Sequence, residues 1–284
     1  MIKYYKIIFQ IIFLNIFIFF NVNNIFRKTN KISIIIPTYN REKLIRKSIQ
    51  SVLNQTYNNI EIIIIDDCSH DNTNKEVKKI RDNRIRYIKL RKNKGANYCR
   101  NLGIKKSTGE YISFLDSDDI FHKNKLERQI KNMKINKSNF DFCKIRIYID
   151  NTNIFKITFP NSNQEKSILN GKIFDELCKG NFISTQSILI KKNILEKYLF
   201  DEKIPRLQDY DLLLRIIPKV KISYTNKVLV DLFLQKDSIG SSLLKLENAI
   251  IIILKKNYNL NLEQNIYLLK NLNSLLENQK NIKK

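Results

Sequence analysis

The sequence predicts an α/β protein with a mostly parallel central sheet and flanking helices. Short runs rich in Ile, typical of strands that are buried on both faces, recur through the first half of the chain. Helical patterns lie between these runs at the spacing of βαβ units. Neither an internal repeat nor a Pro/Gly/Ser-rich linker divides the 284 residues. We therefore expect one main domain, followed by a helical C-terminal extension.

The first half of the chain alternates predicted strands with predicted helices. The strands are expected at residues 32–37, 61–65, 86–90 and 110–115. Apolar residues at helical spacing, or a start signal, predict helices at 41–54, 73–81 and 95–106. Asp71 and Asn72 directly precede the second of these helices and are residue types that cap helices. This order implies βαβ units and a mostly parallel sheet.

The second half departs from simple alternation. Residues 121–134 predict a helix, and residues 141–159 predict short strands joined by Asn-rich turns. Residues 182–190 predict a strand, and residues 208–217 predict a helix that begins with acidic residues. The tail, residues 242–284, has the pattern of two amphipathic helices.

Three of the early strands end in polar clusters. The carboxyl ends of parallel strands meet at one edge of a sheet, where ligands bind in folds of this class. A single cluster is more simply a solvated turn, but three at one edge favour a binding site. The clusters are Pro37-Thr38-Tyr39-Asn40, Asp66-Asp67 and Asp116-Ser117-Asp118-Asp119.

The cluster after residues 110–115 carries the most specific chemistry. Asp116 and Asp118 stand one residue apart behind a buried strand, where they can reach a divalent cation and a diphosphate together. Mg²⁺ or Mn²⁺ prefers such oxygen ligands and keeps substrate phosphate among them. Other phosphate-binding motifs are missing: the sequence has no G-x-x-x-x-G-K-[ST] loop and no G-x-G-x-x-G after the first strand. It also has no G-x-S-x-G nucleophile elbow, which removes support for a hydrolase.

These residues resemble the family 2 glycosyltransferases, which have the Rossmann-like GT-A fold. The resemblance covers roughly residues 32–235, in the family's order and near its spacing. The motifs that carry it are S-I-I-I-P-T-Y-N-R (33–41), S-I-x-S-V-L-N-Q-T-Y (48–57), E-I-I-I-I-D-D-C-S-x-D-x-T (61–73), N-K-G-A-N-Y-C-R-N-x-G (93–103), G-E-Y-I-S-F-L-D-S-D-D (109–119) and L-Q-D-Y-D-L-L-L-R (207–215).

The resemblance implies a binding site for a nucleotide-diphosphate-sugar donor. Pro37, Thr38 and Tyr39 would line the base, with Tyr39 stacking on it. Asp67 would hydrogen-bond the base, and Arg100 would contact the donor nucleotide. Uridine is the commonest base in the family, so a UDP-sugar is expected.

The resemblance also implies the reacting groups. Asp116 would bind the ribose or the sugar, and Asp118 would ligate Mn²⁺ or Mg²⁺. Asp209, which precedes the late helix, would be the catalytic base. Asp211 is the alternative base, because two residues along a helix turn the side chain by about 200° and only one of the two can face the pocket. An acid at the start of a helix can also serve the helix dipole alone.

Two positions depart from the family pattern. Cys68 stands where the family's D-D-G-S motif has Gly, which puts the conformation of that turn in question. Gln208 stands before Asp209 where the family usually has Glu.

The expected function is an inverting, metal-dependent transfer of a single sugar to a glycan, lipid-linked or protein acceptor. One base on the face opposite the leaving group implies inversion. Processive synthases of the family carry Q-x-x-R-W, whereas this chain has no Trp. The alternative is a non-catalytic module on the same fold that binds a nucleotide-sugar or a glycan.

The N-terminus predicts membrane association. Residues 7–26 lack charged side chains, and about twenty such residues can cross a bilayer as a helix. Polar residues dilute this segment, so a signal peptide and an interfacial helix remain alternatives to an anchor. The expected organisation is an anchor or signal segment at 1–28, a GT-A domain at 31–238 and a helical extension at 239–284, with the protein otherwise cytoplasmic.

The net charge of +24 has a simple explanation in composition. Lys, Asn and Ile crowd the chain, as A/T-rich coding DNA would produce, and the basic residues are scattered rather than clustered. A basic nucleic-acid-binding protein is the alternative, but the carboxylates at the strand ends would repel that ligand, so no nucleic-acid partner is expected. The four cysteines are far apart and form no C-x-x-C pair, which indicates buried thiols in a reducing compartment.

Overall fold

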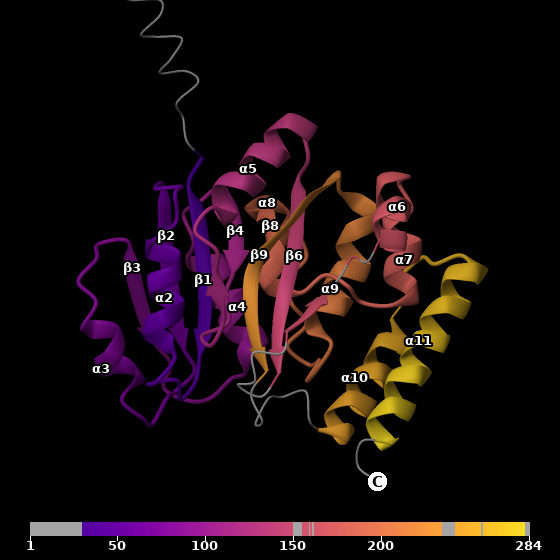
Figure 1. Ribbon diagram of the computed structural model, residues 1–284. Coiled ribbons are helices and arrows are strands. Elements are labelled where there is room, and N and C mark those ends of the chain that lie inside the picture. The colour runs from indigo at the N-terminus through magenta and orange to yellow at the C-terminus, as the bar shows by residue number, and fades with distance from the viewer. Residues whose placement is uncertain are drawn as a thin grey trace, which may run out of the picture.

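The structure is a computed structural model that describes residues 30–149, 155–158, 160, 162–234, 242–256 and 258–281. Figure 1 shows a central, mostly parallel sheet with helices on both faces and a pair of helices at the C-terminal end. The expected α/β fold class is therefore confirmed.

The described residues contribute nine strands to one sheet. Their bounds are β1 (Ile32–Thr38), β2 (Ile60–Asp66), β3 (Ile85–Lys89), β4 (Tyr111–Phe114), β5 (Ile120–Phe121), β6 (Phe140–Ile149), β7 (Phe155–Thr158), β8 (Ile188–Lys191) and β9 (Ile222–Leu234). The order is β3-β2-β1-β4-β8-β6-β9-β5, and β7 pairs with β6. The first four strands in this order run parallel, and so do β6 and β9, whereas β8 is antiparallel to both its neighbours.

The helices that cover the sheet follow from alternation along the strands. Ile34 and Ile36 of β1 pack with helices on one face, whereas Ile35 packs on the other. The first face carries α2 (Ile45–Leu53), α3 (Thr73–Lys78) and α5 (Lys125–Asn136). The second face carries α4 (Ala96–Lys106), α7 (Ile173–Lys179), α8 (Lys192–Lys197), α9 (Gln208–Ile216), α10 (Leu243–Lys255) and α11 (Leu262–Asn281). The remaining helix is α6 (Ser162–Leu169), and two 3₁₀ turns are η1 (Thr185–Ser187) and η2 (Ile217–Lys219).

A glycine lets α4 approach the sheet closely. A Cβ built at Gly103 would lie 2.4 Å from Cγ2 of Ile35 in β1, which is a severe overlap. The missing side chain therefore allows the helix to lie directly against the strand. This close packing fixes Arg100, one turn earlier in α4, relative to the carboxyl end of β1.

The second half of the chain differs from its predicted elements. Only the last residues of the strand predicted at 182–190 belong to β8, because residues 182–184 form a loop and the next three form the turn η1. The helix predicted from residue 121 begins at Lys125, because Ile120 and Phe121 pair with β9 as a short strand. Strands β5 and β9 and helices α6, α7 and α8 were not predicted. The alternation of β9 is interrupted where its register against β6 shifts, around Cys143 and Lys144.

The predicted N-terminal segment, residues 7–26, lies outside the described residues. In the part of the chain that the structure describes, no helix combines the length and the apolar character that a membrane span requires.

Candidate active site

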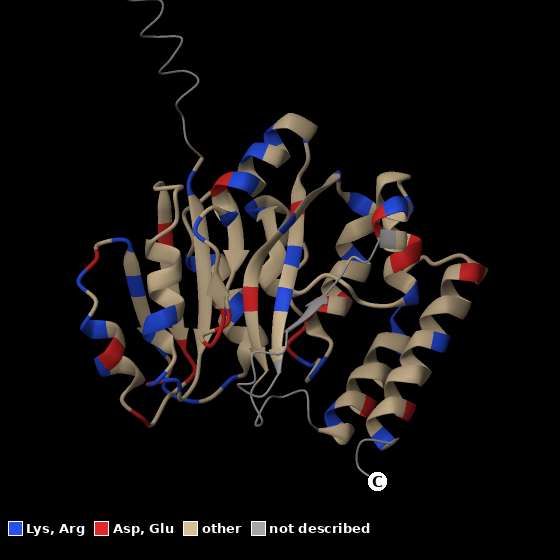
Figure 2. Cartoon of the chain, in the orientation of Figure 1, with Lys and Arg blue, Asp and Glu red and all other residues tan. Residues whose placement is uncertain are grey.

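The loops that follow β1 and β2 are joined at the carboxyl edge of the sheet. The backbone N–H of Asp67 donates to the carbonyl of Thr38 at 2.8 Å. The N–H of Asn40 donates to Ser69 Oγ at 2.9 Å, and the N–H of His70 donates to Asn40 Oδ1 at the same distance. Figure 2 shows acidic stretches of chain gathered at the lower end of the sheet, whereas basic residues are spread over the molecule. Two of the three predicted clusters are thus in direct contact.

The three residues predicted to line the base differ in exposure. Pro37 and Thr38 are buried at the end of β1, whereas the side chain of Tyr39 is 41% exposed. The Tyr39 ring meets the His70 ring edge-on, with the centroids 6.5 Å apart. The buried Oγ1 of Thr38 has no hydrogen-bond partner among the described residues. Tyr39 is therefore the one of the three that presents an accessible aromatic face.

Asp67 organises the loop that leads into α4. Its two carboxylate oxygens accept the backbone N–H groups of Lys94 at 2.6 Å and Gly95 at 2.8 Å. Gly95 has φ 89°, a conformation that side chains disfavour, and this turn aims its N–H at the carboxylate. The Cys99 thiol also hydrogen-bonds this carboxylate, and the remaining lone pair leaves Asp67 able to accept from a ligand.

Cys68 adopts the left-handed conformation expected of the Gly that it replaces. Its φ is 67°, so the turn after Asp67 is kept despite the Cβ. The thiol donates to the carbonyl of Arg91 at 3.5 Å, a weak interaction that only partly offsets the strain. The departure from the family pattern therefore costs backbone strain rather than the turn itself.

Replacing Cys68 with Gly should stabilise the protein. Relief of a left-handed non-glycine residue, less the added entropy of Gly in the unfolded chain, should raise the free energy of unfolding by about 0.5–1 kcal/mol. Urea denaturation of Cys68→Gly against the wild type measures this change. The control Cys68→Ala removes the thiol but keeps the Cβ, so an equal gain in that variant would show that strain is not the cause.

Asp116 and Asp119 are both held by the same amide. Gln186 Nε2 donates to Asp116 Oδ2 at 2.6 Å and to Asp119 Oδ2 at 2.8 Å. The other oxygen of Asp116 pairs with Arg100 Nη2 at 2.8 Å. The other oxygen of Asp119 accepts the N–H of Phe233, at the end of β9, at 3.0 Å. Every carboxylate oxygen of these two residues therefore has a partner.

Asp118 is the least engaged acid of this cluster. Its ion-pair partner is Arg41, whose Nε lies 3.5 Å from Asp118 Oδ2. Burial, and then the nearby Asp116, raises the pKa of Asp118 above its ordinary value. The same causes raise the pKa of the buried Asp119 further. A positive charge placed beside such a crowded, partly buried carboxylate would stabilise its ionised form.

The side chains could hold a divalent cation only together with a ligand that supplies phosphate oxygens. Among the described residues, no group of three or more His, Cys, Asp or Glu side chains is arranged to hold a metal. Mg²⁺ and Mn²⁺ accept few protein carboxylates and complete their coordination with phosphate oxygens and water. Asp118, with an oxygen available beside its Arg41 contact, suits that kind of binding.

Arg100 is buried but only half satisfied. Its residue is 3% exposed, and its Nε and Nη1 have no hydrogen-bond partner in the part of the chain that the structure describes. The guanidinium also lies 5.6 Å from the ring centroid of Phe200. Buried donors without partners cost free energy, so the geometry is suited to an anionic or hydroxyl-rich ligand that would complete them.

Asp209 lies in the first turn of α9, on the face of the sheet that also carries α4. Its Oδ1 accepts the N–H of Tyr210 at 2.8 Å, and its side chain is partly exposed. Burial by the surrounding chain raises the pKa of Asp209, against the lowering effects of the Tyr210 amide, Arg100 and Asn181. Arg100 thus lies close enough to influence Asp209 while it pairs with Asp116. Arg100 therefore relates Asp209 to the acidic loop that contains Asp116.

Asp211, the alternative base, is excluded by its surroundings. It is fully buried, and its oxygens accept from Arg215 Nη2 at 2.8 Å and Tyr258 Oη at 2.8 Å. Lys256 also pairs with it. These partners come from α9 itself and from the chain after α10, so Asp211 ties the segment that follows α10 to α9. The expectation that it could replace Asp209 is wrong.

Removing this carboxylate should destabilise the protein strongly. Asp211→Ala removes the acceptor of Tyr258 and leaves the buried ends of Arg215 and Lys256 with only their second partners, Leu199 and Asp201. We expect a loss of about 3 kcal/mol in the free energy of unfolding. Chemical denaturation measures it. Asp175→Ala is the control, since Asp175 also contacts the C-terminal helices but accepts from Gln264 in a partly exposed position. Equal losses in both variants would contradict the structural role of Asp211.

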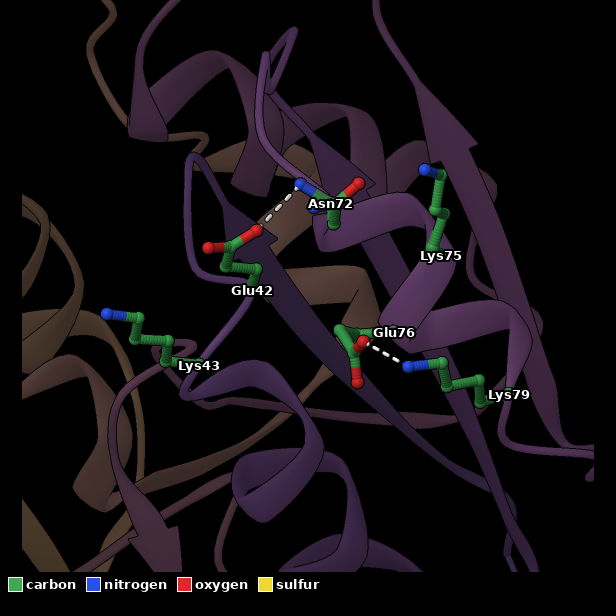
Figure 3. A pocket seen from close by; sticks show the side chains of 6 residues that line it. All are labelled: Glu42, Lys43, Asn72, Lys75, Glu76 and Lys79. Carbon is green, nitrogen blue, oxygen red and sulfur yellow. Dashed lines mark hydrogen bonds and ion pairs between the residues drawn. The ribbon is translucent and has the colours of Figure 1, made fainter.

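A hollow elsewhere on the surface does not coincide with these residues. It has a volume of about 360 Å³ and is lined by Glu42, Lys43, Asn72, Lys75, Glu76 and Lys79. Figure 3 shows its acids engaged within the hollow, Glu42 with the backbone of Asn72 and Glu76 with Lys79. None of the predicted site residues lines it. It lies between the start of α2 and α3 and has mixed charge and an open form.

Two residues near the acids had not been predicted. Gln186 holds Asp116 and Asp119, and Asn181 interacts with Asp209. Both lie between α7 and β8, in a segment that has no acidic, glycine-rich or otherwise recognisable motif. Single-sequence patterns gave no signal that could have found them.

Comparison with known proteins gives the family. Residues 33–199 match the sequence model of Glycosyl transferase family 2. WfgD of Escherichia coli, a UDP-Glc:alpha-D-GlcNAc-diphosphoundecaprenol beta-1,3-glucosyltransferase, is 35% identical over 195 residues, which cover 69% of this chain and 73% of that protein. An uncharacterized glycosyltransferase of Haemophilus influenzae is 31% identical over 77% of this chain and 84% of its own length. Uncharacterized glycosyltransferases of Rickettsia bellii and Rickettsia felis are 37% and 38% identical, but the match spans only 25% and 32% of their length.

Solved structures agree on the fold. S. aureus TarS in complex with UDP-GlcNAc has a TM-score of 0.66 at 23% identity, covering 86% of this chain and 72% of that chain. The mannosyltransferase PcManGT of Pyrobaculum calidifontis, in complex with GDP-Man and Mn²⁺, has a TM-score of 0.64 at 14% identity, covering 89% and 74%. At these identities the likeness shows the GT-A fold alone. The sequence match over more than half of the chain, on the matching fold, shows that the chain belongs to glycosyl transferase family 2.

Proposed function

We propose that the protein is an inverting, metal-dependent glycosyltransferase that moves a single sugar from a nucleotide-diphosphate-sugar to an acceptor hydroxyl in glycan biosynthesis. Residues 31–238 would form the catalytic domain, and residues 239–284 its helical extension. The observation that carries the proposal is Arg100, which pairs with Asp116, influences Asp209 and keeps two buried donors free of any partner among the described residues. A charged ligand between the acidic cluster and Asp209 would satisfy those donors.

The donor nucleotide would occupy the edge between the loops after β1 and β2. Tyr39 offers the exposed ring for stacking on the base, beside Pro37 and Thr38, and Asp67 keeps acceptor capacity for the base. Arg100 would bind the donor nucleotide through its free N–H groups, next to Asp116, which would receive the ribose or the sugar. The UDP-Glc in the name of WfgD supports a UDP-sugar as the donor.

Asp118 would hold Mn²⁺ or Mg²⁺ together with the diphosphate. When bound there, the cation would stabilise the charge that develops on the departing nucleoside diphosphate. Arg41 lies against Asp118 and would move aside or turn toward the phosphates, for which its guanidinium is well suited. PcManGT, a protein of the same fold, was solved with GDP-Man and Mn²⁺, which supports this assignment.

Asp209 would accept the proton of the acceptor hydroxyl as that oxygen attacks the anomeric carbon. An alcohol is a poor nucleophile until a positioned base takes its proton, and a raised pKa makes a carboxylate a better base. A single displacement with the base on the face opposite the diphosphate inverts the anomeric configuration.

The acceptor would be a glycan, a lipid-linked or a protein hydroxyl. A lipid-linked acceptor has support in WfgD, whose name specifies a diphosphoundecaprenol substrate. Such an acceptor would fit a membrane-associated enzyme, with residues 7–26 as its single-pass contact and the remainder on the cytoplasmic side.

A donor panel tests the proposal. The full chain, in detergent, is incubated with UDP-, GDP- and dTDP-sugars with and without Mn²⁺, and released nucleoside diphosphate is measured. We expect Mn²⁺-dependent release from at least one donor, enhanced by a polyprenyl-diphosphate-linked sugar. Binding of donor without turnover, even with acceptor extracts, would instead favour a binding module. Neither binding nor turnover across the panel would refute the proposal.

A further inference from the structure

We propose that Gln186 is a positioning residue that gives the carboxylates of Asp116, Asp118 and Asp119 different roles. It would hold Asp116 and Asp119 in fixed orientations and thereby leave Asp118 as the carboxylate that binds the cation. This inference rests on the proposed function, because it concerns how the metal and donor site is assembled.

The contacts of Gln186 identify it. Both of its partners are carboxylate oxygens, which only accept hydrogen bonds, so the NH₂ end of the amide must face them. One N–H meets Asp116 at 2.6 Å and the other meets Asp119 at 2.8 Å. Both donors of the amide are therefore used to bridge two acids of the same loop.

The backbone that carries Gln186 is itself held. The adjacent Ser187 donates its N–H to the carbonyl of Ser184 at 3.0 Å, which forms the turn η1. The buried amide of Gln129, on α5, donates to the carbonyl of Ser187 at 2.8 Å. The carbonyl of the next residue, Ile188, accepts from Ser113 Oγ of β4 at 2.8 Å. Because the segment is anchored to a helix and to the strand that leads into the acids, the amide has a fixed place to donate from.

The neutrality of the amide matters as much as its position. Asp116, Asp118 and Asp119 bring three carboxylates within four positions of the chain. Like charges this close repel one another, and two N–H dipoles reduce that repulsion. A Lys or Arg at the same place would also neutralise the acids and would then compete with a divalent cation. A neutral donor can order the acids and keep their field available for Mn²⁺ or Mg²⁺.

The two acids that Gln186 bridges also bond residues of β9 and α4. Asp119 is bound by Gln186 through one oxygen and by the N–H of Phe233 in β9 through the other. Asp116 is bound by Gln186 and by Arg100 of α4. Asp118 stands outside this network and keeps its contact with Arg41. Without the amide, Asp116 would keep Arg100 and Asp119 would keep the Phe233 N–H, but nothing would hold the two acids together on either side of Asp118.

Gln186→Met tests the inference, because Met has a similar length and no amide. Gln55→Met is the matched control: Gln55 is equally buried, and its amide bonds only backbone groups, namely the carbonyls of Ser51 and His122 and the N–H of Leu126. A second variant, Gln186→Asn, keeps an amide that is too short to bridge both acids. Mn²⁺ binding in the presence of UDP is measured by electron paramagnetic resonance of free Mn²⁺, and UDP binding without metal is measured by calorimetry.

We expect Gln186→Met to weaken Mn²⁺ binding about 10-fold, because Asp116 and Asp119 would no longer fix the loop geometry around Asp118; losses of this size are common when a residue outside the metal's own ligands is removed. UDP binding without metal should be unchanged, Gln186→Asn should be intermediate, and high Mn²⁺ should restore turnover of both variants. Gln55→Met should lower thermal stability and leave Mn²⁺ binding alone.

Equal Mn²⁺ affinity in wild type and Gln186→Met would overturn the inference while the proposed function stands. The inference would also fall if Gln55→Met weakened Mn²⁺ binding as much as Gln186→Met does. A wild-type protein that binds UDP no better with Mn²⁺ than without it would overturn the metal assignment and this inference together.

Discussion

Asp209→Asn should reduce turnover by about 10³-fold while donor binding stays intact. The amide has the size of the carboxylate and can still accept the Tyr210 N–H, so the start of α9 is preserved. It has no useful basicity, and the acceptor hydroxyl would have to lose its proton to water. The measurement is released nucleoside diphosphate under saturating donor, with calorimetric binding of UDP and Mn²⁺ as the second readout.

Asp175→Asn controls for the loss of a carboxylate outside the site, and its turnover should match that of the wild type. Turnover of Asp209→Asn within about 10-fold of the wild type would be too small a loss for a general base. A parallel loss of nucleotide binding would show instead that Asp209 supports the donor pocket.

The pKa of Asp209 adds a pH dependence with a defined sign. Because the pKa of Asp209 is raised in the folded state, its base form is reached at a higher pH than for an ordinary Asp. The acidic limb of the kcat/KM profile should therefore lie at higher pH. The same raised pKa means that the folded state loses stability as the pH rises through the interval between the unfolded and folded pKa values. Asp209→Asn should therefore be more stable than the wild type at neutral pH, although it is inactive. A melting curve as a function of pH checks this stability–activity trade-off.

The early half of the fold was predictable from sequence because its strands are buried on both faces. Continuous Ile-rich runs such as Ile32–Pro37 and Glu61–Ile65 cannot be solvated, and the helices between them fit only parallel crossovers. Strand β9 was not predictable in the same way. It contains Thr225, Asn226 and Lys227 where its register against β6 shifts, so its alternation is lost locally.

The acidic part of the site was predictable to the level of motifs, but not of partners. Sequence position indicated that residues after β1, β2 and β4 would meet, and the structure joins them through Asn40, Ser69 and Arg41. The choice between Asp209 and Asp211 could not be made from helical geometry, because either residue could have faced the pocket. Lys256 and Tyr258, far along the chain, bond the buried Asp211 and so remove it as a candidate base, while the role of Asp209 stays a prediction.

Asp118→Ala should abolish the metal-dependent part of donor binding and lower turnover by about 10³-fold or more, since the cation supplies several kcal/mol of charge stabilisation in such reactions. Of the three acids in the loop, Asp118 is the one whose loss breaks no hydrogen bond that orders the fold. Asp116 supports Arg100, and Asp119 supports the end of β9. The variant should therefore fold normally, with Arg41 released from its ion pair.

UDP binding titrated with and without Mn²⁺ separates the metal from the nucleotide. In the wild type Mn²⁺ should tighten UDP binding, whereas in Asp118→Ala the two titrations should coincide. Asp82→Ala is the control, since Asp82 pairs with Arg84 before β3 and lies away from the acidic loop. If Asp118→Ala keeps the Mn²⁺ effect, the cation must use Asp116 or Asp119. Either would first have to leave Gln186, so the bridge that orders these acids would then open on metal binding.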